Sequence, residues 1–183
     1  MYYIIGIIVL VILWAIVAYN GFVRKVNHAK EALSDIDIQL KRRYDLIPNL
    51  VNTVKGYASH ETSAFQNVTA ARAAAMGATG LANKSVAEDK LSGSLKSIFA
   101  IAEAYPDLKA NQNFLSLQSE LSDTEDKIQS ARRFYNSTAM ELNTSAKSFP
   151  GNMIAGSFHF SPMEYFALDA SDAAAKNPVS VNF

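Results

Sequence analysis

The sequence predicts an all-α protein with an N-terminal transmembrane helix, an antiparallel four-helix-type bundle of long helices and an irregular, aromatic-rich C-terminal tail. Three observations predict it. An uncharged apolar run opens the chain, long segments after it repeat apolar residues every three or four positions, and this period is lost after Gly151. We therefore expect an anchor over residues 1–20, a bundle over 21–150 and a tail with a short helix over 151–183.

The composition excludes several classes of protein. With 183 residues, of which 49% are hydrophobic and 19% charged, the chain is globular rather than disordered. A formal net charge of zero gives no reason to expect nucleic acid as a partner. Since the chain has no cysteine, it has no disulfides, cysteine-ligated metals or thiol nucleophiles.

The N-terminal run from Tyr2 to Tyr19 contains no charge and no proline. As a helix rising 1.5 Å per residue it would span about 27 Å, close to the thickness of about 30 Å of a bilayer core. Tyrosines at both ends suit the two membrane interfaces. A cleaved signal peptide is the alternative, but no basic segment precedes the run. We expect an uncleaved anchor with the lipid bilayer as its partner.

Cations next to the anchor predict its orientation. Nothing basic precedes the run, whereas Arg24, Lys25 and Lys30 follow it closely. The positive-inside rule then places the bundle in the cytoplasm and the N-terminus outside.

Four helical segments are expected after the anchor. The first continues from the anchor to about Ala58, and the second, alanine-rich, covers Ser59 to Met76. The third opens with a capping box formed by Ser85 and Glu88 and ends at Pro106, and the fourth covers 114–149. Short connections imply antiparallel neighbours. Small residues on the apolar face of the fourth segment favour a bundle over an extended coiled coil.

Proline and a run of cations interrupt the pattern of the first segment. Pro48 should kink or break that helix, because a proline inside a helix costs about 3 kcal/mol. If the helix is straight, Lys41 lies roughly 33 Å from Tyr19, too far for lipid headgroups at a screening length of about 8 Å. A charge run of this kind is usually a solvated face, with ion pairs such as Asp37 to Lys41. As a candidate interaction surface we consider Lys41, Arg42, Arg43 and Asp45.

The tail combines aromatic residues with two weak structural patterns. Ser161 and Glu164 form a second capping box that predicts a short helix through Phe166, and residues 178–183 alternate like a strand. The aromatic side chains either fold back over the bundle or dock on a neighbouring subunit or partner. The candidates for such docking are Phe158, Phe160, Tyr165 and Phe166.

Five motifs, in this order, carry a resemblance to a known family. They are Asp35-Ile-Asp-Ile-Gln-Leu-Lys-Arg-Arg-Tyr-Asp-Leu-Ile-Pro-Asn-Leu-Val51, Lys55-Gly-Tyr-Ala-Ser-His-Glu61, Ala104-Tyr-Pro-Asp-Leu-Lys-Ala-Asn111, Ala131-Arg-Arg-Phe-Tyr-Asn136 and Phe149-Pro-Gly-Asn152. The chain resembles the LemA family of bacterial membrane proteins over nearly its whole length after the anchor. The resemblance implies one membrane helix followed by an antiparallel helical bundle, and it implies no enzymatic reaction or cofactor.

Catalytic and metal-binding patterns are weak. His60-Glu61 begins like the zinc-protease motif, but Ala64 stands where the second histidine is required. His28 and His159 show no ligand spacing, and neither a phosphate-binding glycine loop nor a Gly-x-Ser-x-Gly elbow occurs. We therefore expect no enzyme, no cofactor, no metal and no small-molecule substrate, with a hydrolase as a remote alternative.

Two functional hypotheses follow. The first is a non-enzymatic, single-pass protein of the bacterial inner membrane whose bundle is a scaffold or adaptor for another membrane protein. The second is self-association into an oligomer that organises or remodels the membrane. Cross-linking distinguishes them, because a ladder of self-products indicates assembly and a foreign product indicates an adaptor.

Overall fold

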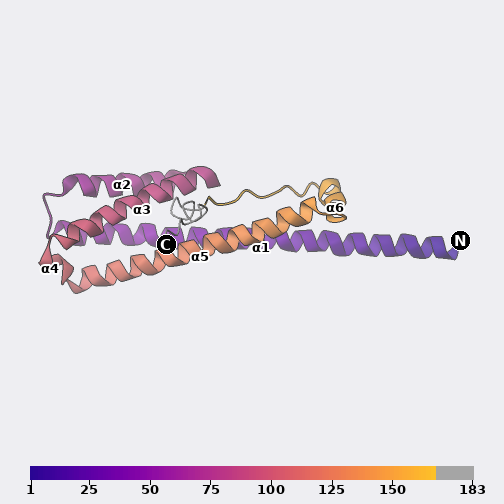
Figure 1. The fold of residues 1–183 in the computed structure, drawn as a ribbon, viewed down its shortest axis with the longest axis horizontal. Coiled ribbons are helices and arrows are strands. Elements are labelled where there is room, and N and C mark those ends of the chain that lie inside the picture. The colour runs from indigo at the N-terminus through magenta and orange to yellow at the C-terminus, as the bar shows by residue number, and fades with distance from the viewer. Residues whose placement is uncertain (168–183) are drawn as a thin grey trace, which may run out of the picture. The chain divides into compact units, whose positions relative to one another are not determined.

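The structure, a computed structural model, describes residues 1–167, and within them every regular element is a helix (Figure 1). The elements are α1 (Tyr2–Lys55), α2 (Thr62–Gly77), α3 (Leu81–Glu103), α4 (Pro106–Lys109), α5 (Gln112–Lys147) and α6 (Gly151–Ser157). The predicted all-helical class, with one long apolar helix at the N-terminus, is confirmed. The strand-like residues 178–183 lie outside the described part.

The chain forms two compact units, which are described separately. The first unit contains residues 1–36 and 131–165, and the second contains residues 37–130 together with Phe166 and Ala167 at the end of the described part. Both α1 and α5 contribute residues to each unit.

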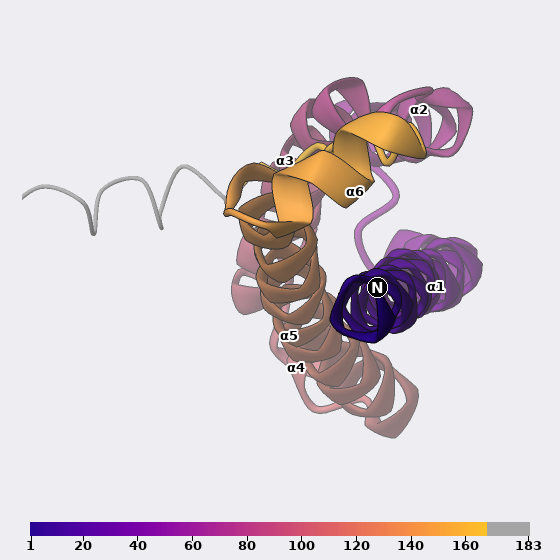
Figure 2. The same ribbon diagram turned by 90° about the vertical axis from the view of Figure 1, so that its right-hand side faces the viewer.

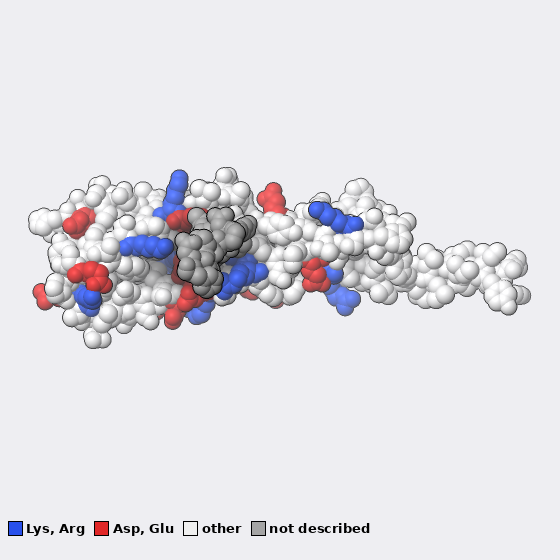
Figure 3. Space-filling view, in the orientation of Figure 1, with Lys and Arg blue, Asp and Glu red and all other residues white. Residues whose placement is uncertain are grey.

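In the first unit, α1 begins with the predicted apolar run and continues without a break through Asn20 and Gly21. The expected continuity of the anchor with the first bundle helix is therefore confirmed. By length and composition this helix is suited to cross a membrane, and Figure 3 shows its N-terminal end free of charged side chains. The core of the first unit joins Phe22 of α1, Leu142 of α5 and two residues of α6, Ile154 and Ala155.

Close packing between α5 and α6 depends on a glycine (Figure 2 views these helices from the end of the molecule). A Cβ atom added to Gly151 would lie 2.4 Å from the carbonyl oxygen of Ser145 and 3.5 Å from Cζ of Phe22. Since real Cβ atoms do not approach backbone oxygens so closely, any larger residue would push α6 away from α5. The sequence analysis expected no helix at 151–157, so α6 is a correction to it.

The short helix expected from Ser161 to Phe166 is wrong, because these residues are not helical. Their backbone groups are bonded to side chains of α5 instead. Asn143 donates to the carbonyl of Met163 at 2.9 Å and accepts from its amide at 2.8 Å. The hydroxyl of Tyr135 donates to the carbonyl of Glu164 at 2.7 Å. These three hydrogen bonds hold the chain extended along α5 and remove the donor and acceptor groups that a helix needs.

In the second unit, α2 and α3 pack side by side as a helical hairpin joined by residues 78–80 (Figure 1). Gly80 provides the turn with a φ of 78°, a left-handed conformation that suits glycine. Because α3 begins at Leu81, the capping box predicted at Ser85 and Glu88 is wrong: both residues lie inside the helix and are buried. Ser85 donates to the carbonyl of Ala167 at 3.2 Å.

Pro48 lies inside α1 and does not end it, since the helix continues to Lys55. The predicted interruption is therefore wrong, while a bend at this position stays a prediction. Proline has no N–H group, so the carbonyl of Tyr44, four residues earlier, loses its usual helical donor. In its place Nε of Arg72, from α2, donates to that carbonyl at 2.7 Å. The proline thus frees an acceptor that connects α1 to α2.

This exchange of donors predicts that Pro48 and Arg72 are energetically coupled. In the native background, Arg72→Ala should cost about 1–2 kcal/mol because it leaves the Tyr44 carbonyl without a donor. In a Pro48→Ala background the restored amide at position 48 serves that carbonyl, so the same change should cost almost nothing. Urea unfolding of the four proteins in detergent measures the coupling. An equal cost of Arg72→Ala in both backgrounds would contradict the assignment.

Candidate functional site

The most unusual feature of the second unit is a buried arginine. The side chain of Arg43, on α1, is fully buried and donates to the carboxylates of Glu88 on α3 and Glu125 on α5. It also donates to Oγ of Ser92 at 2.9 Å. One guanidinium group therefore joins three helices, using the fork of donors that makes arginine suited to binding two carboxylates at once.

Tyr44 extends this network to the second oxygen of Glu88. The tyrosine hydroxyl donates to Oε1 of Glu88, while Arg43 binds Oε2. Burial raises the pKa of Tyr44 well above its usual value near 10, and the hydrogen bond to Glu88 and the charge of that carboxylate raise it further. The tyrosine therefore remains a neutral donor, and both oxygens of a fully buried carboxylate are hydrogen-bonded.

The charges in the network are unequally exposed. Glu88 and Arg43 are excluded from water, whereas the side chain of Glu125 is 29% exposed. Pairs of this kind contribute little net stability compared with apolar packing, but removing one partner leaves an uncompensated buried charge and costs about 3–5 kcal/mol. Such a network selects one arrangement of its helices, because a shift of any helix along its axis would separate the charges.

Arg43 corrects the sequence analysis, which assigned it to an exposed surface. The run of cations was interpreted as a solvated face, yet Arg43 lies three residues after Leu40 and four before Ile47, both of which are buried. This spacing places it on the core face of α1. The buried Glu88 precedes Leu91 by three residues and Leu95 by seven, which likewise places it on the core face of α3. The sequence signal for the pair of Arg43 and Glu88 was therefore a charged residue at a core position of the helix period, in both α1 and α3.

The other three polar candidates are exposed. Lys41 bonds to Asp45 one turn later at 2.5 Å, and Arg42 lies 3.8 Å from Glu120. Asp37, expected to pair with Lys41, pairs with Lys84 of α3 instead. The predicted polar group is therefore divided between the surface and the core.

The aromatic candidates are divided between the two units and differ in exposure. In the first unit, Phe158 packs against Tyr19 with ring centroids 4.8 Å apart, and Phe160 stacks on Phe22 at 5.1 Å. Phe158 remains 54% exposed and Tyr165 remains 51% exposed. In the second unit Phe166 is buried.

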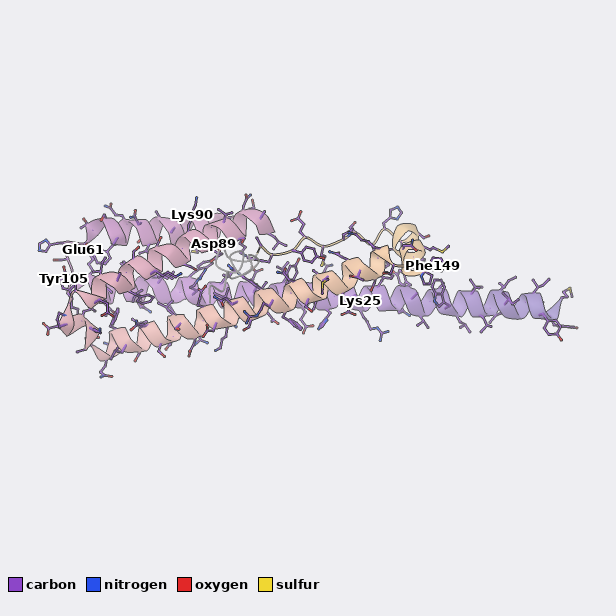
Figure 4. The ribbon with its side chains drawn as sticks, viewed as in Figure 1. Lys25, Glu61, Asp89, Lys90, Tyr105 and Phe149 are labelled. Carbon is purple, nitrogen blue, oxygen red and sulfur yellow. The ribbon has the colours of Figure 1, made fainter. Side chains whose placement is uncertain are left out.

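A groove between α3 and α5 opens beside the ion-pair network. Its volume is about 470 Å³, and Ser92 and Glu125 belong to both features. Apolar side chains line part of the groove, namely Leu95, Phe99 and Leu121, and polar side chains complete it, namely Asp89, Lys96, Gln118, Ser122 and Gln129. Figure 4 marks Asp89 on α3, at the N-terminal end of the lining residues of this helix.

Metal-binding groups do not gather in the described part of the chain. Within residues 1–167, no three His, Asp or Glu side chains lie together in a way that could hold a metal ion. His28 contacts the edge of Phe134 at 5.4 Å in the first unit, and His60 is exposed in the turn after α1. The absence of a catalytic activity and of a cofactor stays a prediction.

Comparison with known proteins decides the family. The sequence profile of the LemA family matches residues 32–183, which is most of the chain. The protein belongs to the LemA family. The resemblance inferred from the five motifs is therefore confirmed, and the matched region begins within α1, after its apolar run.

Curated relatives include proteins of two kinds. The chain is 26% identical to the magnetosome protein MamQ of Magnetospirillum gryphiswaldense, in an alignment that covers 81% of this chain and 64% of MamQ. It is 29% identical to protein LemA of Metamycoplasma hominis, over 74% of this chain and 63% of that protein. The chain thus spans slightly less than two thirds of these relatives. LemA membership and the apolar N-terminal helix together support a membrane location.

The buried hydroxyl of Tyr44 predicts how stability changes in alkali. Below pH 10 the phenol is protonated in the folded and the unfolded protein, so its contribution is complete. Above pH 10 the unfolded chain loses this proton and the folded protein does not, because the folded pKa is raised. The free energy of unfolding should then fall by up to about 1.4 kcal/mol per pH unit on account of this group. Urea unfolding between pH 9 and about 11 should show a shallower decline for Tyr44→Phe; an unchanged slope would contradict the assignment.

Proposed function

We propose that this LemA-family chain is a non-enzymatic, single-pass membrane protein whose second unit is a scaffold or adaptor for another membrane protein. In this proposal residues 2–19 cross the bilayer and the second unit is an antiparallel four-helix-type bundle. The observation that carries the proposal is the groove between α3 and α5, whose walls are fixed by the Arg43 network.

The lining of the groove supports a helical partner. The lining residues of α3 are at positions 89, 92, 93, 95, 96 and 99, and those of α5 at 118, 121, 122, 125 and 129. These spacings of three and four mean that each helix presents one face to the groove. Two such faces, apolar in part and polar elsewhere, suit the apolar side of an amphipathic helix. The volume of about 470 Å³ is within the usual range for binding pockets and admits a few side chains of that helix.

Rigid walls favour the binding of a partner. Glu125 and Ser92 face the groove and are also held by Arg43, so the site is ordered before a partner arrives. A preformed site loses less conformational entropy when it binds. The exposed Lys41, Arg42 and Asp45 belong to α1 and do not line the groove, so in this proposal they are secondary contacts.

We further propose the bacterial inner membrane as the location, with the N-terminus outside and the second unit in the cytoplasm. The support is the position of the cations, since Arg24 and Lys30 are exposed shortly after the apolar run.

Site-specific photo-cross-linking tests the adaptor proposal. Because the chain has no cysteine, a benzophenone maleimide can be attached at a single introduced one. Ser122→Cys places it in the groove, and Ser119→Cys, exposed on α5 outside the groove, is the matched control. After illumination in native membranes, we expect one foreign protein to be attached at position 122 and not at position 119.

A variant that fills the groove tests whether the adduct at position 122 depends on the groove. Gly93 lines the groove, and a Cβ atom added there would meet nothing within 4 Å, so Gly93→Leu should fill the groove and strengthen the helix. It should abolish the adduct at position 122. A ladder of self-products would favour the self-assembling alternative, and equal adducts at both positions would contradict the groove as the binding site.

A further inference from the structure

A part of the first unit packs against the apolar run of α1. Among the first 20 residues, Ala15 and Ala18 are the two that are not exposed. Both pack against the core cluster that contains Ile154 and Ala155 of α6. Ala15 precedes Tyr19 by four residues, or about 6 Å along the helix axis, so the packing around this cluster extends past the end of the apolar run.

The outer face of this region is apolar and uncovered. Phe149 is 80% exposed, Met153 is 60% exposed and Phe158 is 54% exposed, while Ile154 and Ala155 of the same region point into the core. Figure 4 marks Phe149 at the junction of α5 and α6, beside α1. The inner face therefore packs into the core cluster, while the outer face stays largely exposed, with the ring of Phe158 resting in part against Tyr19.

Charge is absent from this region and present at its edge. Between Lys147 and Glu164 the sequence has no aspartate, glutamate, lysine or arginine. Lys147, in the last turn of α5, is exposed, and so is Arg24, five residues after Tyr19. Aromatic and apolar side chains next to cations are the usual composition of segments that lie in a membrane interface.

We propose that α6, including Met153, and its flanking residues Phe149 and Phe158 insert into the boundary between headgroups and acyl chains of the same bilayer that α1 crosses. The proposal rests on the membrane anchoring proposed above. Lipid is the occupant that continuity favours, because a bilayer that covers α1 as far as Tyr19 also reaches the level of Ala15 and Ala18, which pack against the cluster that includes two residues of α6. The protein then has two membrane contacts, one spanning and one interfacial.

A second contact has a mechanical consequence. A single spanning helix can rotate about its axis and tilt, whereas an interfacial segment fixed to one side of it restricts both movements. Tyr19 contributes to this fixation, since its ring lies 4.8 Å from that of Phe158 and 5.6 Å from that of Phe160. The interfacial segment therefore limits the rotation of α1 about its own axis and its tilt in the bilayer.

Tryptophan fluorescence in the full-length protein tests the proposal. The chain has one tryptophan, Trp14, so Trp14→Phe provides a background for a single reporter. Met153→Trp places it on α6, and Met140→Trp, on α5 and 56% exposed in the native protein, is the matched control. The proteins are reconstituted into phosphatidylcholine–phosphatidylglycerol vesicles that contain lipid brominated near the glycerol backbone. We expect strong quenching for Met153→Trp and little for Met140→Trp.

The native protein separates this proposal from the one on which it rests. Quenching of Trp14 by lipid brominated deep in the acyl chain shows that α1 is inserted; its absence would contradict the anchoring itself. If Trp14 is quenched and Met153→Trp is not, the interfacial segment is overturned. Protection of that reporter from both lipid and aqueous acrylamide would mean that a second copy covers the face, which also overturns the proposal. Phe149→Trp replaces Met153→Trp should the latter lose helical circular dichroism.

Discussion

The second unit depends on the burial of one positive charge. Arg43 lies on the core face of α1, where its charge is stable only if carboxylates neutralise it. Glu88 and Glu125 meet this requirement from α3 and α5, which fixes the axial position of both helices relative to α1. Tyr44 completes the set by donating to Glu88. An apolar core of equal volume would tolerate sliding of these helices; the charged one does not.

Pro48 allows a further polar contact, which connects α1 to α2. Its missing N–H leaves the Tyr44 carbonyl free for Arg72 of α2, so the six residues from 43 to 48 connect α1 to α2, α3 and α5. Ser92 and Glu125, which bind Arg43, also line the groove, so the network holds part of the groove wall in place. A binding surface with fixed walls is what a scaffold needs, and it places the proposed function on the same residues that determine the packing.

Periodicity predicted the helices well because apolar side chains repeat with the helix period in α1, α3 and α5. It failed where a polar group is stabilised by partners distant in sequence. Arg43 was assigned to the surface because its charge was weighed against solvent and not against Glu88, which lies 45 residues away. The helix expected at residues 161–166 was prevented by Asn143 and Tyr135, whose bonds to that backbone no local pattern reveals. The groove needs the positions of α3 and α5 together, so the sequence alone could not locate it.

The central claim is that neutralisation of Arg43 holds the second unit together. Glu88→Gln tests it most directly, because the side chain keeps its volume but loses its charge and one of the two oxygens that accept from Arg43 and Tyr44. Glu120→Gln is the matched control, since Glu120 is exposed and pairs with Arg42 at 3.8 Å. Urea unfolding of the full-length protein in detergent should show a loss of about 3–5 kcal/mol for Glu88→Gln and less than about 1 kcal/mol for the control. Equal, small losses for the two variants would contradict the account.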